Sequence, residues 1–211
     1  MPRVDLHAPI ALLGGGGHAK VVIGALQAAG YRNLRVYDDD PRRAGSTLLG
    51  VPVAGLIESA AADAPAGALS CIGNNAVRRR LATLPLPWMT LVHPFAWVHD
   101  SVQLGLGTVV FAGAVVQPEA RIGDHVIVNT SASVDHECVL GDFAQVTPGV
   151  HLGGNVTLGE GAFLGVGAIA IPGVHVGAWS VVGAGAVVVS DLPERVVAMG
   201  VPARVRRRLV E

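Results

Sequence analysis

The sequence predicts an α/β, half-Rossmann-like N-terminal domain followed by a parallel β-helix. Two patterns carry this prediction. The first 40 residues read as strand, glycine turn, helix, strand and acidic turn, and from residue 92 to residue 188 an aliphatic residue recurs at every sixth position. We expect the N-terminal domain to cover residues 1–88, the β-helix residues 89–190 and a C-terminal tail residues 191–211.

The N-terminal domain opens with the succession of a βαβ unit. Residues 9–13 predict a buried strand, and four consecutive glycines follow them. A helix is expected over 18–29, with Gly30 as its stop, and a second strand over 34–37. A further strand over 69–72 and a short basic helix over 75–84 precede the prolines that lead into the β-helix.

The glycine turn has the chemistry of a phosphate-binding loop. Glycines allow backbone N–H groups to approach a phosphate, and the N-terminus of the next helix adds a favourable dipole. Asp38 follows the second strand, where a carboxylate can bind a ribose or a base. The pattern Gly14-x-Gly16-x-x-Ala19 is a weak signal by itself, and a purely structural turn is the less favoured alternative. Because the region before residue 92 is too short for a complete dinucleotide fold, it suits a mononucleotide or a nucleotide-sugar better.

The repeat holds its period of six over seventeen positions, sixteen of which are Val, Leu or Ile. An amphipathic helix does not keep such a period, whereas a hexapeptide repeat is typical of a parallel β-helix. A second column, two residues earlier, holds small residues such as Ala114 and Ala132, and we expect both columns to point inward. If three hexapeptides close one coil, stacked residues are eighteen apart. We expect this register to end after Val188.

Composition argues against several classes of protein. The net charge of −1 gives no general case for nucleic acid binding. No stretch of 18 apolar residues predicts a membrane span, and we see no signal peptide. Two cysteines do not make a disulfide framework; Cys138 lies in the small inward column and Cys71 in a predicted strand, so a reducing cytoplasm fits.

His136 is the best candidate for chemistry among the eight histidines. It lies at a corner or outward position, and Gly154 stacks one eighteen-residue coil above it. Asp135 and Glu137 flank it, and a carboxylate can orient an imidazole and raise its basicity. The residues alone leave open whether His136 is a catalytic base or a surface histidine. The other histidines of the β-helix region are expected to be solvated or stacked on the surface: His93, His99, His125, His151 and His175.

The chain also resembles a known family. The hexapeptide repeat, the Asp135-His-Glu-Cys138 segment and the closing Gly200-Val-Pro-Ala203 resemble the left-handed β-helix acyltransferases. The glycine turn before His18, the Tyr37-Asp-Asp39 segment and Ile72-Gly-Asn-Asn75 narrow the resemblance to the sialic-acid/bacillosamine branch, the nucleotide-4-amino-sugar N-acetyltransferases. The resemblance covers roughly residues 9 to 205. It alone implies the left hand of the β-helix, which the period does not reveal.

This resemblance implies a reaction and its catalytic residues. His136 would be the general base that takes a proton from a sugar amine as the amine attacks the thioester of acetyl-CoA directly. Such a base contributes on the order of 100- to 10,000-fold to the rate. Glu137 would hydrogen-bond the imidazole, and the backbone N–H of Gly154 would stabilise the developing oxyanion. No metal is expected.

The resemblance also implies the binding residues. The co-substrate acetyl-CoA would contact four residues: Gln145, Val166, Ala184 and Arg204. Gln145 departs from a histidine of the family, and the tail that carries Arg204 is equally compatible with a solvated basic segment. The nucleotide-sugar would contact eight residues: Gly16, Gly17, His18, Asp38, Asp39, Gly73, Asn74 and Asn129. The resemblance further implies a cytoplasmic homotrimer whose active sites lie between subunits.

Three other functions remain compatible with the sequence. The first is an O-acetyltransferase of a sialic acid or another glycan hydroxyl, for which the same base would serve. The second is a zinc hydratase of the β-helix carbonic anhydrase type, which needs three histidines around a metal; His136 and His151 are 15 positions apart and do not stack. The third is a catalytically inactive sugar-binding scaffold. The sequence does not choose between UDP, GDP and dTDP sugars, or fix the sugar's stereochemistry.

Overall fold

The computed structural model of the protein describes residues 4–210. The chain divides into two compact units, Met1–Pro94 and Phe95–Glu211. The first is the α/β unit and the second is the repeat unit, so the order of the two predicted parts is confirmed.

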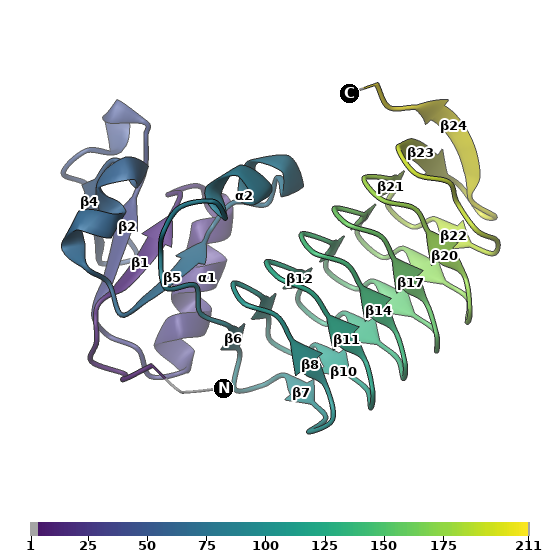
Figure 1. The fold of residues 1–211 in the computed structure, drawn as a ribbon, viewed down its shortest axis with the longest axis horizontal. Helices are drawn as coiled ribbons and strands as arrows, with labels where there is room; N and C mark the ends of the chain where they lie inside the picture. The colour runs from purple at the N-terminus through teal and green to yellow at the C-terminus, as the bar shows by residue number, and fades with distance from the viewer. Residues whose placement is uncertain (1–3, 211) are drawn as a thin grey trace. The chain divides into compact units, whose positions relative to one another are not determined.

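A five-stranded sheet forms the centre of the first unit (Figure 1). Its order is β3-β4-β2-β1-β5, and the strands are β1 Ile10–Leu13, β2 Leu34–Tyr37, β3 Thr47–Leu48, β4 Val51–Gly55 and β5 Gly67–Ser70. β1 pairs in parallel with both β2 and β5. Because β1 has strands on both sides, all four of its residues are buried, as its uninterrupted apolar sequence predicts.

The helices of this unit are α1 (Gly17–Ala28), α2 (Asn75–Leu81) and the 3₁₀ helices η1 (Pro41–Arg43) and η2 (Ile57–Asp63). The predicted bounds of α1 and β2 agree with these to within one residue. β5 lies two residues earlier than predicted, and α2 ends three residues earlier. Pro85 excludes Leu84 from the helix, because a proline disfavours helical backbone in the residue before it.

The carboxyl ends of β1, β2 and β5 lie at the same edge of the sheet, because the three strands are parallel neighbours. The chain runs from β1 to β2 on one side and later returns to place β5 on the other side of β1. Such a reversal of strand order leaves a crevice in which α/β proteins bind ligands. The glycine turn after β1 and the loop after β5 flank it.

The second unit is a parallel β-helix of short strands (Figure 1). Strand β6 (Leu91–Val92) precedes sixteen two-residue strands: β7 Trp97–Val98, β8 Gln103–Leu104, β9 Val109–Val110, β10 Val115–Val116, β11 Arg121–Ile122, β12 Ile127–Val128, β13 Ser133–Val134, β14 Val139–Leu140, β15 Gln145–Val146, β16 His151–Leu152, β17 Thr157–Leu158, β18 Phe163–Leu164, β19 Ile169–Ala170, β20 His175–Val176, β21 Val181–Val182 and β22 Val187–Val188. Together with β23 (Val196–Met199) and β24 (Arg204–Arg208), they form three sheets of order β22-β19-β16-β13-β10-β7, β20-β17-β14-β11-β8 and β24-β23-β21-β18-β15-β12-β9-β6. Every paired strand from β7 to β22 lies one eighteen-residue coil from its neighbour, as in the pairing of Ser133 with His151.

The two predicted inward columns form the core of the β-helix. Val116 and Ala114 are both fully buried, and the same holds along the coils above them. The first coil is an exception: Val92 is exposed, and Val98 and Leu104 are only partly buried. These three residues belong to the lowest level of the stack, where no earlier coil covers the column.

The prediction that the pattern ends after Val188 is wrong in part. Leu192 forms a bridge with Val176, and β23 (Val196–Met199) pairs in parallel with β21. Paired residues such as Val176 and Leu192 are sixteen positions apart, so the β-helix continues with a coil that is two residues shorter. The side chain of Ser180 closes the shortened coil: its hydroxyl donates to the carbonyl of Pro193 (2.7 Å) and accepts from the N–H of Val196 (3.0 Å). Strand β24 (Arg204–Arg208) then returns antiparallel to β23.

The expectation of a surface location is wrong for His125. This residue is 4% exposed, and its ring stacks on that of Phe143 one coil above, with 5.4 Å between centroids. Its ring also occupies the space above Gly107, where a Cβ would come within 2.5 Å of the ring atom Cε1. The corner column places aromatic rings over one another and over glycines, so the histidine is part of the packing.

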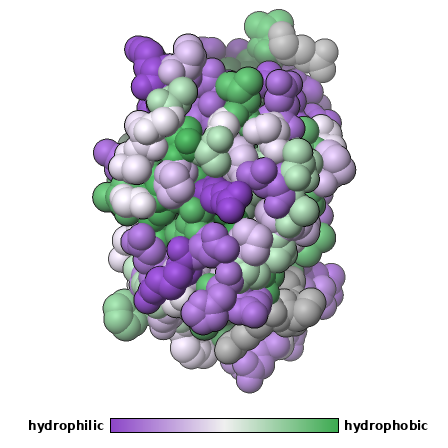
Figure 2. All heavy atoms as spheres, turned by 90° about the vertical axis from the view of Figure 1, so that its left-hand side faces the viewer, coloured by the Kyte–Doolittle hydropathy of each residue, from purple (hydrophilic) through white to green (hydrophobic). Residues whose placement is uncertain are grey.

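The molecular face drawn in Figure 2 carries hydrophilic residues with hydrophobic ones between them. Within residues 4–210, no helix has the length and apolar character needed to cross a membrane.

Candidate active site

His136 and Glu137 form a hydrogen-bonded pair at a corner of the β-helix, directly after β13. Nδ1 of His136 lies 2.9 Å from Oε2 of Glu137. The same carboxylate oxygen accepts a bond from Nδ2 of Asn155, one coil above, at 3.3 Å. The backbone N–H of His136 donates to Oδ1 of Asp135 at 2.8 Å. Both side chains of the pair are about half exposed, at 55% and 50%. The bond to Glu137 therefore holds the ring at Nδ1.

Gly154 lies against the ring of His136. A Cβ at residue 154 would come within 2.5 Å of both Cε1 and Nε2 of that ring, so only glycine leaves the imidazole in place. Within residues 4–210, the N–H of Gly154 donates no hydrogen bond. The imidazole thus lies against a residue whose N–H is uncommitted, and acyl transfer requires both a base and a hydrogen-bond donor. The oxyanion role of Gly154 stays a prediction.

Val166 and Ala184 stack at a different corner, in agreement with their eighteen-residue spacing. Each precedes a glycine with positive φ, 67° at Gly167 and 65° at Gly185. The N–H of Gly185 donates to the carbonyl of Val166 at 2.8 Å. Both side chains are exposed, and neither backbone N–H donates a hydrogen bond within the described part of the chain. This edge offers two free N–H groups in line, and its contact with acetyl-CoA stays a prediction.

Gln145 and Arg204 have different surroundings. Gln145, in β15, is only 6% exposed, and its Oε1 has no hydrogen-bond partner among residues 4–210. Arg204 opens β24 opposite Met199 of β23. All five residues of β24 are exposed, but the segment is a paired strand and not a solvated tail. β23 forms the level of the coil above Ala184. Arg204, which pairs with Met199 of β23, therefore lies past the end of the corner column formed by Val166 and Ala184.

One chain does not bring the predicted base and the predicted acetyl-CoA residues together. The outer face of β10, β13, β16 and β19 separates their corners. Pro148 stacks below Val166, and the six residues from it to Gly154 span at most about 20 Å. Asn129 also lies beyond this face, with its Oδ1 accepting from the N–H of Thr130 at 2.8 Å. A complete site formed from these residues needs a long ligand or a second copy of the chain.

In the first unit, Asp38 shapes the glycine turn. Its Oδ2 accepts from the N–H of Gly15 (2.5 Å) and its Oδ1 from the N–H of Asp40 (2.8 Å). A Cβ at Gly16 or Gly17 would meet no atom within 4 Å. Packing within the chain therefore does not require glycine at these two positions, and the open space above them suits an approaching ligand.

His18 and Arg78 are two titratable side chains at this edge, and only Arg78 is charged near pH 7. Burial, together with the charge of Arg78, lowers the pKa of His18 to about 4, so this histidine is neutral near pH 7. Arg78 is 1% exposed and donates to the carbonyls of Ile72 (3.2 Å) and Gly73 (3.4 Å) and to Oδ1 of Asn75 (3.1 Å). Burial lowers the pKa of Arg78 to about 10, which leaves it charged. A fixed positive charge thus underlies the loop after β5.

Sequence reasoning described this segment only as a short basic helix and did not select Arg78. Its signal is the helical period: Asn75, Arg78 and Leu81 are three residues apart and all three are buried, whereas Arg79 and Arg80 are exposed. Asn74 precedes this helix as its N-cap, and its Oδ1 accepts from the N–H of Val77 at 3.0 Å.

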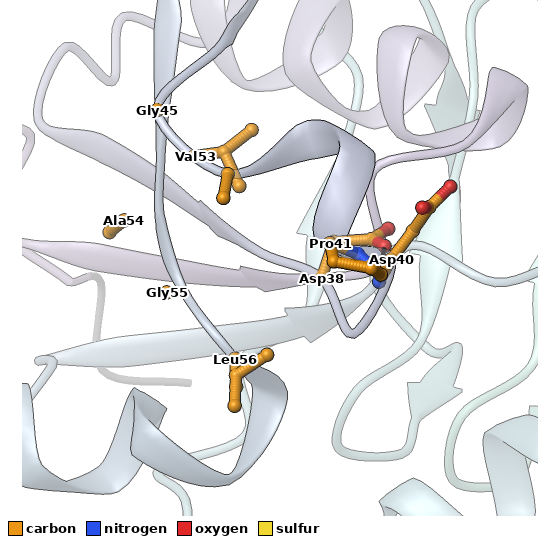
Figure 3. A pocket seen from close by; sticks show the side chains of 9 residues that line it. Asp38, Asp40, Pro41, Gly45, Val53, Ala54, Gly55 and Leu56 are labelled. Carbon is orange, nitrogen blue, oxygen red and sulfur yellow. Dashed lines mark hydrogen bonds between the residues drawn. The ribbon is translucent and has the colours of Figure 1, made fainter.

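A pocket of about 140 Å³ lies beside Asp38 (Figure 3). Asp38, Asp40 and Pro41 line one side, and the end of β4 with Leu56 lines the other. Asp39 does not line the pocket; its Oδ1 accepts from the N–H of Ile57 at 2.9 Å and so caps η2. Of the two acids predicted to meet the base and ribose, the pocket thus favours Asp38. Its second carboxylate is Asp40, which the sequence reasoning did not select.

Metal coordination has no support from the described residues. Within residues 4–210, no group of three or more His, Cys, Asp or Glu side chains is arranged to hold a metal ion.

Comparison with known proteins places this geometry in context. The family model of the PglD N-terminal domain matches residues 9–84. A GDP-perosamine N-acetyltransferase from Caulobacter crescentus, solved as a variant with CoA and GDP-perosamine, is 42% identical over 94% of this chain and 97% of that one, with a TM-score of 0.88. The acetyltransferase domain of PglB from Neisseria gonorrhoeae, solved with acetyl coenzyme A, is 36% identical over 94% and 99%, also with a TM-score of 0.88.

A third structure, WeeI from Acinetobacter baumannii, is 27% identical over 93% of this chain and 99% of that one, with a TM-score of 0.83. A search of curated protein sequences found no match.

The fold and the His136 corner define a left-handed β-helix acyltransferase. The chain belongs to the family of nucleotide-amino-sugar N-acetyltransferases, hexapeptide-repeat enzymes with a PglD-type N-terminal domain.

Proposed function

We propose that this enzyme transfers the acetyl group of acetyl-CoA to the 4-amino group of a nucleotide-linked 4-amino-4,6-dideoxy sugar. The observation that carries the proposal is the His136 corner, where an imidazole held by Glu137 lies against Gly154. The match to acetyltransferases solved with CoA or acetyl coenzyme A supports the donor, and the match to an enzyme solved with GDP-perosamine supports the acceptor class.

The reaction follows from the roles of three groups. Neutral His136 accepts a proton at Nε2 as the amine nitrogen attacks the thioester carbon, while Nδ1–H donates to Glu137. The carbonyl oxygen becomes an oxyanion that the N–H of Gly154 can stabilise. When the intermediate collapses, the carbon–sulfur bond breaks, CoA leaves as the thiol after gaining a proton, and the amide remains on the sugar.

The two units divide the binding of substrates. The glycine turn with Gly16 and Gly17, the neutral His18 and the Gly73–Asn74 loop would hold the diphosphate. The pocket at Asp38 would take the nucleoside. A GDP-linked sugar is the first candidate, because the relative solved with GDP-perosamine is 42% identical over almost its full length.

We further propose a cytoplasmic homotrimer. The distance between the His136 corner and the Val166 edge within one chain supports a site that a neighbouring copy completes. The free, buried thiols of Cys71 and Cys138 fit a reducing compartment. Light scattering should give about 65 kDa, three times the 21.6 kDa of the chain; a monomeric but fully active enzyme would contradict the shared site.

The test is a thiol-release assay with acetyl-CoA and a panel of GDP-, UDP- and dTDP-linked 4-amino-4,6-dideoxy sugars, with mass spectrometry and NMR of the product. We expect turnover on one nucleotide series and an amide at C4. No turnover on the whole panel, together with retained acetyl-CoA binding, would contradict the proposal and favour a glycan hydroxyl as the acceptor.

A further inference from the structure

Ser133 and His151 form a polar pair on an otherwise apolar face of the β-helix. They are direct partners in the parallel pairing of β13 with β16. Oγ of Ser133 lies 2.8 Å from Nδ1 of His151. The other outward residues of this six-stranded sheet are all apolar: Trp97, Val115, Ile169 and Val187. In the described part of the chain, Ser133 and His151 are thus the only outward polar residues among the paired strands of this sheet, and a serine fixes the histidine ring. Packing on an apolar face does not require such a pair, which suggests a role in binding.

The pair lies on the same two coils as the catalytic corner. Ser133 precedes His136 by three residues, and His151 precedes Gly154 by three. Three residues extend at most about 11 Å, so the backbone of each member of the pair lies within that distance of the backbone of His136 or Gly154. The His151 ring is exposed, and within residues 4–210 its Nε2 makes no hydrogen bond. One ring nitrogen is therefore used for orientation, and the other is presented to the space beside the site.

We propose that His151, oriented by Ser133, binds a ring hydroxyl of the amino-sugar acceptor and so positions its amine at His136. This inference rests on the proposed function. A sugar hydroxyl both donates and accepts, so it can bond Nε2 in either neutral tautomer, depending on the direction of the Ser133–His151 bond. Val115 and Ile169, the neighbours of the pair on this face, are apolar and suit the carbon-bound hydrogens and the methyl group of a 6-deoxy sugar.

The acceptor fits this position better than acetyl-CoA does. The predicted acetyl-CoA residues Val166 and Ala184 offer backbone N–H groups at the opposite corner of this face. A hydroxyl of the acceptor, in contrast, is fixed close to the amine by the sugar ring itself. The nucleotide is bound elsewhere in the proposal, so His151 contributes to recognition of the sugar alone.

The test compares His151→Ala with two other variants. His175→Ala is the matched control, because His175 is an exposed histidine at the same place in its hexapeptide but on another sheet. His151→Gln keeps a polar group near the position of Nε2. We expect His151→Ala to raise KM for the nucleotide amino sugar about three- to tenfold, with KM for acetyl-CoA unchanged within twofold. His151→Gln should recover part of the loss, and His175→Ala should match the wild type.

Binding measurements separate this inference from the proposed function. By calorimetry, His151→Ala should weaken binding of the nucleotide amino sugar and leave binding of the nucleoside diphosphate alone unchanged. Equal affinity of wild type and variant for the amino sugar would overturn the inference even if the enzyme turns over. A raised KM for acetyl-CoA, or a changed mass in light scattering, would overturn it by assigning His151 to the donor or to a subunit contact. If the wild type lacks turnover but the binding difference is found, the proposed reaction fails and the sugar contact stands.

Discussion

The imidazole of His136 lies so close to Gly154 that a single methyl group at position 154 would meet two of its ring atoms within 2.5 Å. Glu137 and Gly154 therefore fix the ring from two directions: the carboxylate holds Nδ1, and the glycine leaves room for the edge that carries Nε2. We expect this relationship to be the most sensitive point of the enzyme.

Gly154→Ala should separate catalysis from stability. The added Cβ forces the half-exposed His136 ring to rotate away, which we expect to lower kcat by at least about 100-fold, the scale of a lost general base. Because the ring can move into solvent, the free energy of unfolding should change by less than about 1 kcal/mol. Gly24→Ala is the control: a Cβ there meets nothing within 4 Å in α1, and activity should be unchanged. Normal turnover of Gly154→Ala would show that the ring position is irrelevant.

Glu137→Gln should reduce kcat at least about tenfold without changing KM for either substrate. The amide keeps the size of the side chain but replaces the carboxylate that accepts from Nδ1 at 2.9 Å, so the base loses its orienting charge. Asn155→Ala removes a longer bond of 3.3 Å to the same oxygen and should have a smaller effect. Steady-state kinetics of both variants checks this order; a larger loss for Asn155→Ala would contradict it.

Val166→Pro tests the acetyl-CoA edge. Pro148 occupies the same corner position one coil below, before a glycine of similar φ (68° at Gly149, 67° at Gly167), so the backbone should accept proline. The substitution deletes the free N–H of residue 166. We expect KM for acetyl-CoA to rise about two- to tenfold, the effect of one lost hydrogen bond, while the unfolding midpoint stays the same or rises. Val166→Ala keeps the N–H and should behave like the wild type; equal KM values for all three proteins would remove residue 166 from the donor site.

His18 should make stability depend on pH. Its pKa is lowered to about 4 in the folded chain, against an ordinary value of 6.5, so between these values the unfolded chain binds more protons. The stabilising contribution is complete above pH 6.5 and is lost as the pH falls toward 4. Urea unfolding at pH 5 and pH 7 should show a smaller wild-type stability at pH 5, and His18→Gln should reduce this difference. An NMR titration that finds an ordinary pKa for His18 would contradict the account.

The repeat was readable from the sequence because two side-chain positions in every six must fill a narrow core, and Val116 and Ala114 represent these two columns. The contact between Gly154 and His136 was readable for a similar reason, since a fixed coil length places Gly154 over His136. The continuation after Val188 was not, because the coil shortens by two residues and Ser180 closes the gap through side-chain bonds that no period reveals.

The surroundings of several other side chains were less predictable for physical reasons. His125 looked like a surface residue, but the corner column buries aromatic rings over glycines. Arg78 was not selected because it lies beside Arg79 and Arg80, which are exposed, and only the helical period separates it from them. The predicted coil length makes Ser133 and His151 neighbours, but it does not show that their side chains form a hydrogen bond.

The most direct measurement is the initial rate of CoA thiol release from acetyl-CoA with the preferred nucleotide 4-amino sugar, for wild type and His136→Asn. The variant keeps a polar side chain at the corner but cannot act as a base. The account predicts ready turnover by the wild type, a loss of at least about 100-fold in kcat for the variant and nearly unchanged KM values. Comparable kcat values for the two proteins would contradict the assignment of His136 as the base.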